Sequence, residues 1–163
     1  MDITFKTDEG RFNYRAAGII IHHNKLLIMK DEHTPYYYFP GGRVAMNELS
    51  KDAIVREIRE ELNVEVKVNR MLWVNENFFH EEYFNENFHE ICFCYLLDLV
   101  DDELINKGEE FIFKVSGKRT HYFYWKDLNE VKDLNLYPLF IKDNILQLPQ
   151  AIEHTVEGVS VYV

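Results

Sequence analysis

Residues 41–64 read GGRVAMNELSKDAIVREIREELNV, and this stretch decides the fold. Two glycines open it, and glycine permits a tight turn and a close approach of the backbone to a ligand. From Leu49 to Leu62 there is no glycine or proline, and strong helix formers dominate, so the stretch predicts a helix there. At about 100° per residue, the apolar arc of this helix consists of Ile54, Val55, Ile58 and Leu62.

A second stripe of the predicted helix is acidic. Glu61 follows Glu57 by four residues and Glu60 follows it by three, so the three carboxylates are neighbours on the helix surface. Like charges at this spacing destabilise a helix by roughly 0.2–0.5 kcal/mol per pair, and carboxylates near its C-terminus oppose the macrodipole. Such a conflict with local rules indicates a functional site, and a hard divalent cation such as Mg²⁺ would resolve it. The alternative is a solvated acidic face that Arg56 and Arg59 partly neutralise.

The spacing of the polar residues favours the functional interpretation. Glu48 follows Gly42 after five residues, an Arg-Glu pair begins at Arg56 after seven more, and an aliphatic residue, two glutamates and Asn63 follow. This pattern resembles the Nudix box of the Nudix (MutT-like) hydrolases, G-x5-E-x7-R-E-U-x-E-E-x-G-U, over residues 42–64. One position departs, because Asn63 replaces the last glycine. Asn also tolerates the left-handed conformation expected after a helix.

The resemblance implies an α/β protein with the Nudix fold, a mixed β-sheet sandwiched between α-helices. It implies that Glu57, Glu60 and Glu61 bind one to three Mg²⁺ ions, or Mn²⁺, and that a backbone carbonyl at Gly41 joins them. It further implies hydrolysis of the pyrophosphate linkage in a nucleoside diphosphate joined to another moiety. Glu60, Glu61 or a later carboxylate would orient or deprotonate the attacking water. The alternative is a non-catalytic Nudix-fold module that binds or senses a nucleotide, but such modules commonly lose box carboxylates.

Other residues would support the site. The resemblance implies that Glu48 and Arg56 pair to hold the loop against the helix, next to Gly42. Asn47, Glu48 and Ser50 lie where the helix starts, and any of them could interact with its N-terminus.

Substrate contacts are predicted at Arg43, Tyr38 and Phe79. The two aromatic residues belong to a set that could stack a base, because every base has a π-face. The alternative is that these rings pack in the core.

A carboxylate inside an apolar run is a further candidate. Residues 88–97 are typical of a buried strand, and Glu90 interrupts them. Such a residue is rarely buried unless paired. Nudix enzymes often draw another metal-binding or base carboxylate from beyond the box, which makes Glu90 the first candidate and Glu82 the second. The alternative is that Glu90 only pairs with a basic side chain.

The flanks of the box are rich in strand patterns. We predict a hairpin of residues 11–22 and 25–29, a strand over 64–74, and a loop near the site in the middle of 75–87. An acidic loop or irregular hairpin is predicted over 98–118, a helix from Pro138 to about Leu146 with residues 139, 141, 145 and 146 on the sheet, and a β-prone run over 155–163.

Composition limits the function classes. The 163 residues predict one domain over 1–163, and the net charge of −10 argues against a large nucleic-acid interface but not against a small polyphosphate. No apolar run reaches transmembrane length and no signal peptide is evident, so we expect a cytoplasmic protein without membrane contact. Cys92 and Cys94 are expected as reduced thiols, and a homodimer through the β-rich flanks is plausible. No proline lies between Pro40 and Pro138, which disfavours the ADP-ribose pyrophosphatase branch.

Overall fold

The computed structural model describes residues 1–114 and 119–158. The strands are β1 (Thr4–Thr7), β2 (Gly10–His22), β3 (Lys25–Asp31), β4 (Gly41–Arg43), β5 (Val66–Glu81), β6 (Glu86–Leu99), β7 (Glu110–Lys114), β8 (Thr120–Asp127) and β9 (Glu153–Glu157). The helices are α1 (Ser50–Leu62), α2 (Glu103–Asn106), the 3-10 helix η1 (Val131–Asp133) and α3 (Phe140–Asn144).

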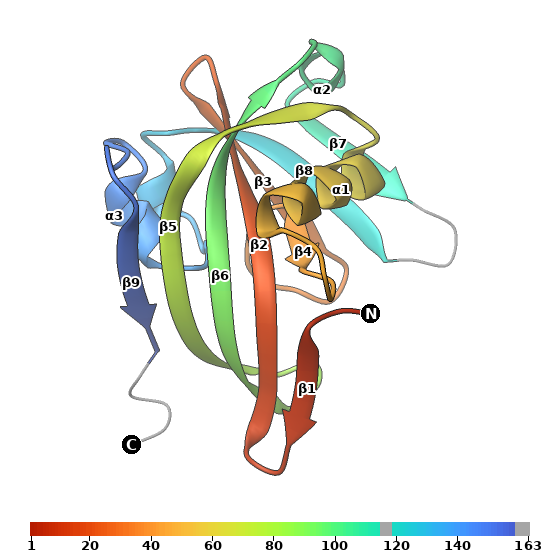
Figure 1. Cartoon of the computed structure of the whole chain (residues 1–163). Coiled ribbons are helices and arrows are strands. Elements are labelled where there is room, and N and C mark those ends of the chain that lie inside the picture. The colour runs from red at the N-terminus through yellow and green to blue at the C-terminus, as the bar shows by residue number, and fades with distance from the viewer. Residues whose placement is uncertain (115–118, 159–163) are drawn as a thin grey trace.

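Strand β2 is the centre of the sheet (Figure 1). The strand order is β7-β8-β3-β2-β6-β5-β9, and β1 and β4 also pair with β2. The β2–β6 and β5–β9 pairs are parallel and the others are antiparallel, so the sheet is mixed. Within β2, only the last residues pair with β3, whereas the earlier residues of β2 pair with β1 and β4. Strand β2 therefore joins the two halves of the sheet.

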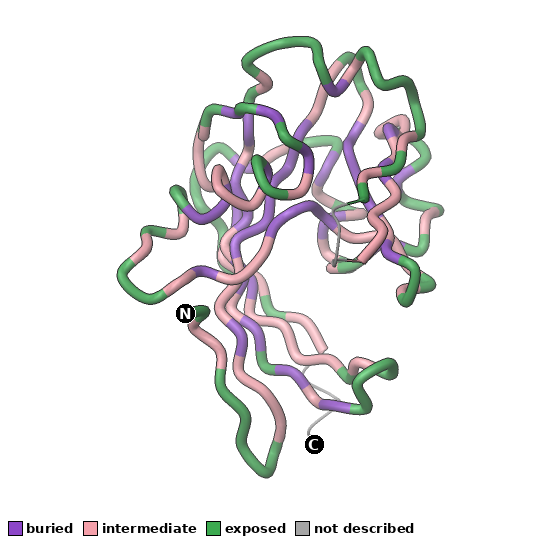
Figure 2. Tube along the Cα trace, turned by 90° about the vertical axis from the view of Figure 1, so that its right-hand side faces the viewer, coloured by how far each residue is buried: buried purple, intermediate pink, exposed green. Residues whose placement is uncertain are grey.

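Helices cover both faces of this sheet (Figure 1), and the buried residues gather in the interior of the molecule (Figure 2). On one face, α1 buries Ile54, Ile58 and Leu62 completely, and Val55 packs at the edge of the same core. Each fully buried side chain of this size contributes roughly 1.5–3 kcal/mol. On the other face, α3 and η1 bury apolar residues against Trp73 of β5. The predicted fold class and the apolar arc of the helix are both confirmed.

Among the described residues, five asparagine or histidine residues have φ angles in the left-handed region, and three of them bear on the predictions. His23 and Asn24 have φ angles of 45° and 64°, as a two-residue hairpin turn between β2 and β3 requires. Asn63 follows α1 with φ 54° and ψ 38°, and its N–H donates to the Arg59 carbonyl at 2.9 Å. The predicted hairpin and the predicted conformation of Asn63 are confirmed.

The loop predicted in the middle of residues 75–87 is present but short, because it consists of the turn 82–85 alone. Strand β5 continues to Glu81 and pairs directly with β6, so the connection is only residues 82–85. Aromatic pairs across the strands replace the missing apolar alternation: Phe78 stacks on His89 at 4.4 Å, and Phe79 stacks on Phe88 at 5.0 Å. Asn75 is completely buried, whereas the other polar residues in this part of β5 keep some exposure to solvent.

The helix predicted from Pro138 is shorter and starts later, because α3 spans only Phe140–Asn144. The Glu157 carboxylate of β9 accepts hydrogen bonds from the N–H groups of Leu139 and Phe140, both at 2.9 Å, which fixes the helix start. Ile141 and Ile145 pack on the sheet as predicted. Leu139 and Leu146 do not, because they lie at the ends of this short helix and remain 45% and 64% exposed.

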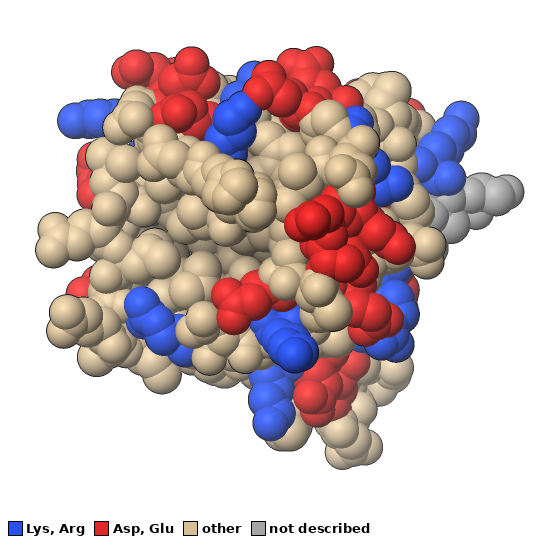
Figure 3. All heavy atoms as spheres, turned by 90° about the horizontal axis from the view of Figure 1, so that it is seen from above, with Lys and Arg blue, Asp and Glu red and all other residues tan. Residues whose placement is uncertain are grey.

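The predicted acidic loop over 98–118 contains regular structure, since α2 lies within it and β7 pairs with β8. Residues 115–118 and 159–163, on which parts of two predictions fall, lie outside the described residues. Figure 3 shows acidic side chains in clusters on the face seen from above, and the exposed Asp101, Asp102 and Glu103 lie at α2. Among the helices of residues 1–114 and 119–158, none has the length and apolar character that a bilayer crossing requires.

Candidate active site

The acidic stripe of α1 lies against the glycine turn. A Cβ atom on Gly42 would lie 2.3 Å from Cδ of Glu57, so only glycine leaves room for this carboxylate beside β4. The N–H of Gly41 donates a 3.0 Å hydrogen bond to Oε2 of Glu61. Gly41 itself has a φ of 144°, and a Cβ there would lie 2.2 Å from the Ala16 carbonyl oxygen. The two glycines thus bring the backbone of β4 into contact with two carboxylates of the helix.

The Glu48–Arg56 pair implied by the resemblance is present. Arg56 donates from Nε and Nη2 to the two oxygens of Glu48, and from Nη1 to Glu57 at 2.6 Å. Its Nη2 also donates to the Arg43 carbonyl at 3.1 Å. The hydrogen bond from Arg56 lowers the pKa of Glu48. The loop between β4 and α1 is therefore tied to the helix at Arg56.

The residues expected at the helix start have other partners. The residue before α1 is Leu49, and no side chain caps the N-terminus. Glu48 accepts from the Ala45 N–H at 2.9 Å, and Ser50 shares a 2.7 Å hydrogen bond with the Tyr95 hydroxyl. The expected interaction of Asn47, Glu48 or Ser50 with the helix N-terminus therefore does not include a side-chain cap, because Glu48 and Ser50 hydrogen-bond to Arg56 and Tyr95 instead.

Glu61 carries unusual electrostatics. Burial raises its pKa to about 8, and the neighbouring charges of Glu57 and Glu60 act in the same direction. Arg15 and the Gly41 N–H lower the pKa, but they offset only part of the increase. The raised pKa means that too little positive charge lies near Glu61 to stabilise its ionised form.

The donor set fits a hard divalent cation. Carboxylate oxygens are the ligands that Mg²⁺ takes, and a cation would reverse the unfavourable charge at Glu61. Within residues 1–114 and 119–158, no group of three His, Cys, Asp or Glu side chains is arranged to hold a metal ion as it stands. The contacts explain this, because Arg56 engages Glu57 and the Gly41 N–H engages Glu61. At Gly41, the observed contact is made by the N–H, and the predicted role of its carbonyl stays a prediction.

Glu90 lies on β6, with 9% of its surface exposed. Asn13 of β2 donates from Nδ2 to Oε2 of Glu90 at 2.8 Å, and its Oδ1 accepts from Nε of Arg43 at 2.7 Å. Glu90 and Glu61 both interact electrostatically with Arg15, and although burial lowers the pKa of Arg15, their negative charges raise it overall. Arg15 thus links Glu90 to the acidic stripe. Glu82, the second candidate, is exposed in the β5–β6 turn.

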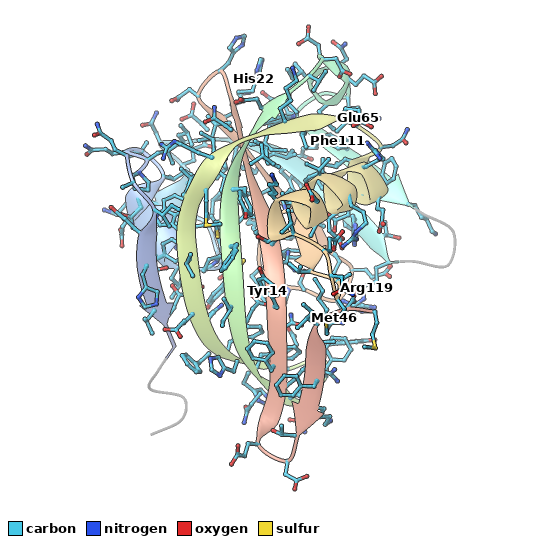
Figure 4. The ribbon with its side chains drawn as sticks, viewed as in Figure 1. Tyr14, His22, Met46, Glu65, Phe111 and Arg119 are labelled. Atoms are coloured by element: carbon cyan, nitrogen blue, oxygen red, sulfur yellow. The ribbon has the colours of Figure 1, made fainter. Side chains whose placement is uncertain are left out.

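Asn13 and Arg15 were missed by sequence reasoning. A signal was present, because Arg11, Asn13 and Arg15 alternate with Phe12 and Tyr14, and alternate residues of a strand share one face. The polar residues of β2 therefore formed a second stripe, which faces the same side as Glu90. Figure 4 shows Tyr14 on β2 below α1. The ring of Tyr14 contacts Phe93 on the face of the sheet opposite to the polar stripe of β2.

The predicted aromatic contacts have distinct surroundings. The Tyr38 hydroxyl donates to Oδ2 of Asp31 at 2.9 Å, and burial together with the charge of Asp31 raises the pKa of Tyr38. Phe79 stacks on Phe88 and lies two residues from Asn77, which pairs with Glu90, so it shares the face of Glu90. Both rings are half-buried. They are therefore neither wholly in the core nor free in solvent.

Comparison with known proteins identifies relatives. A family model described as NUDIX domain matches residues 13–139. An ADP-ribose pyrophosphatase of Methanocaldococcus jannaschii is 33% identical over 120 residues, a match that covers 72% of this chain and 63% of the relative. This chain therefore spans less than two thirds of the length of that curated relative.

Solved structures share the fold. An ADP-ribose pyrophosphatase from Streptococcus suis 89-1591 superposes with a TM-score of 0.55 and 16% identity over 89% of this chain and 98% of the other. A MutT protein from Bacillus halodurans gives a TM-score of 0.62 and 16% identity over 91% and 92% of the two chains. At these identities, the structural likeness concerns the fold.

Proposed function

This chain belongs to the Nudix family, and from that premise we propose that it is a divalent-metal-dependent hydrolase. Its reaction would cleave the pyrophosphate linkage of a nucleoside diphosphate joined to another moiety. The observation that carries the proposal is the acidic stripe of α1. Glu57 and Glu61 lie against the Gly41-Gly42 turn, and Glu61 has a pKa raised to about 8 by burial.

Each residue then has a role in the reaction. Glu57, Glu60 and Glu61 would hold Mg²⁺ or Mn²⁺, which when bound neutralises phosphate oxygens and lowers the pKa of a bound water. Glu60, Glu61 or Glu90 would accept the proton of the attacking water. Glu60 is accessible, with 45% of its side chain exposed, whereas Glu90 is buried and oriented by Asn13. Arg43 would contact the phosphates of the substrate.

The substrate class is proposed from the relative. The curated relative is named an ADP-ribose pyrophosphatase, which supports ADP-ribose as the first compound to test. This weighs against the expectation from the missing proline after the box. Tyr38 and Phe79, both half-buried, would contact the base. An oxidised nucleoside triphosphate, a dinucleoside polyphosphate, a nucleotide sugar and a capped nucleotide end complete the panel.

The test is metal-dependent turnover of that panel. We expect product release from at least one compound with Mg²⁺ or Mn²⁺, and none with EDTA. Glu60→Gln and Glu61→Gln should each lower the rate by at least roughly 100-fold, as expected for groups that act on the reacting water. Glu65→Gln is the matched control, because Glu65 is exposed and pairs only with Arg59 among the described contacts. Full turnover in either of the first two variants would show that the assignment is wrong.

A nucleotide-binding module is the second candidate function. Such a module would gain thermal stability from a nucleotide and a divalent cation and yet release no product from any compound. A cytoplasmic location and a homodimer through the β-rich flanks stay predictions. Light scattering after size-exclusion chromatography tests the dimer.

A further inference from the structure

Two arginines lie directly opposite each other on neighbouring strands. Arg15 of β2 pairs with Arg43 of β4. The same antiparallel register pairs Ala16 with Gly42 and Ala17 with Gly41. Side chains of paired residues project from the same face, and like charges directly opposite each other are destabilising. The fold retains this pair beside the acidic stripe despite the repulsion between the two charges. Such a conflict with local rules indicates a functional role for the pair.

The contacts of the two guanidinium groups leave donors unused. Arg15 donates from Nη2 to the Phe39 carbonyl at 2.9 Å, and Arg43 donates from Nε to Asn13. Arg43 also lies 3.9 Å from Asp2. A guanidinium has five N–H donors, so among the described contacts most donors of both groups are available. Both side chains are half-buried and keep some access to solvent.

Carboxylates around the pair reduce the repulsion between the two arginines. Glu61 and Glu90 both interact with Arg15 and partly neutralise it. Asn13 fixes Arg43 and Glu90 at the same time through its two side-chain atoms. Arg15 therefore has both the Glu61 carboxylate of α1 and Arg43 of β4 as neighbours. A cation would take the carboxylates, which leaves the guanidinium groups to face negative charge from a ligand.

Resting on the proposed function, we infer that Arg15 is a substrate-binding residue that forms a guanidinium cradle with Arg43. The cradle takes the pyrophosphate oxygens that the cation does not hold. Planar guanidinium groups match phosphate oxygens in pairs of hydrogen bonds, which a lysine ammonium cannot reproduce. The Nudix box contains Arg43 but not Arg15, because Arg15 comes from β2.

The experiment measures binding of methylenediphosphonate, a pyrophosphate analogue that resists hydrolysis, by calorimetry with excess Mg²⁺. Arg15→Ala should weaken its binding roughly 10- to 100-fold, and Arg15→Lys should recover only part of the loss. Ethylguanidinium added to Arg15→Ala should restore binding. Arg70→Ala is the matched control, because Arg70 of β5 is also half-buried and donates to a backbone carbonyl, that of Pro149, at 2.5 Å.

Metal affinity separates this role from a structural one. Removal of the positive charge at Arg15 should leave Mn²⁺ binding unchanged or tighter, since Arg15 interacts with Glu61. A residue that only maintains the shape of the site would instead weaken Mn²⁺ binding, and ethylguanidinium would have no effect.

Three results would overturn the inference. Arg15→Ala could bind methylenediphosphonate as tightly as the unmodified protein, or no more weakly than Arg70→Ala, or it could lose Mn²⁺ binding in parallel. If the unmodified protein cleaves the substrate panel in any of these cases, the cradle alone is wrong. If the unmodified protein neither binds the analogue nor cleaves any compound, the cradle and the proposed function are both wrong.

Discussion

Arg56 donates two hydrogen bonds to Glu48, from Nε to Oε1 at 2.7 Å and from Nη2 to Oε2 at 2.9 Å. This paired geometry joins the loop after β4 to the middle of α1. A second pair of the same geometry exists at the far end of the helix, where Arg59 donates to both oxygens of Glu65 at 2.7 and 2.8 Å. The two pairs differ in exposure: 34% for the Arg56 side chain and 59% for that of Arg59.

The first prediction uses this difference. Arg56→Lys keeps the charge but loses the paired geometry, and it should lower the free energy of unfolding by about 1–2 kcal/mol. Arg59→Lys should lower it by less than about 0.5 kcal/mol, because exposed pairs contribute little. Urea unfolding followed by circular dichroism measures both. Equal losses in the two variants would show that the Glu48–Arg56 pair is an ordinary surface contact.

The second prediction concerns the end of α1. Asn63 has φ 54°, a conformation that costs most residues roughly 1–2 kcal/mol. Asn63→Gly, which restores the family residue, should leave the free energy of unfolding unchanged or slightly higher, whereas Asn63→Ala should lower it by about 1 kcal/mol. Thermal unfolding tests this order. If Asn63→Ala proves as stable as Asn63→Gly, the left-handed conformation does not limit the choice of residue.

These two features show what the sequence could and could not predict. Local spacing within one segment of the chain predicts the helix, the left-handed Asn63 and the Glu48–Arg56 pair. Asn13 meets Glu90 because β2 pairs in parallel with β6, and Arg15 meets Arg43 because β2 also pairs with β4, and no local pattern specifies either pairing. The length of the loop after Asn75 was not predictable for a related reason. The polar residues of that segment resembled a loop, but cross-strand partners on β6 made it a strand.

The third prediction concerns pH and metal at Glu61. Burial raises the pKa of Glu61 from 4.5 to about 8 in the folded protein. Its contribution to stability is therefore fully present below the unfolded pKa of 4.5 and is lost as pH rises through about 8. In EDTA, the protein should become progressively less stable between about pH 4.5 and pH 8 and change little above pH 8, and Glu61→Gln should lack this component. Thermal unfolding across this range measures it, and identical pH profiles for the two proteins would contradict the raised pKa.

The fourth prediction adds the cation to the same titration. A cation competes with the proton of Glu61, so Mn²⁺ affinity should rise by up to about tenfold per pH unit until pH 8 and then level off. Calorimetric titration with Mn²⁺ at several pH values tests this. Affinity that does not change with pH would mean that Glu61 is not among the ligands.

The fifth prediction concerns Asp31, whose side chain is only 5% exposed. Burial alone would raise its pKa, but hydrogen bonds from the His33 N–H, the Tyr38 hydroxyl and Arg119 lower it overall. Asp31→Asn should therefore lower the free energy of unfolding by about 1.5–3 kcal/mol at neutral pH. Because the folded pKa is depressed, this contribution is present above the ordinary value of 3.8 and is lost as pH falls through the folded pKa.

Thermal unfolding of both proteins between neutral and acidic pH measures that contribution. The difference between the unmodified protein and Asp31→Asn should shrink on acidification. A difference that stays constant at acidic pH would show that packing, and not the charge of Asp31, is responsible.

The parallel pairing of β2 with β6 has a consequence for synthesis. Asn13 and Glu90, which are hydrogen-bonded in the site, are 77 residues apart in the chain. While the ribosome translates the first half of the message, β6 does not yet exist, and the edge of β2 that pairs with it stays unpaired. Asn13 and Glu90 can therefore meet only after β6, which ends at Leu99, has emerged, so a nascent chain that stalls earlier carries the Nudix box without an assembled site.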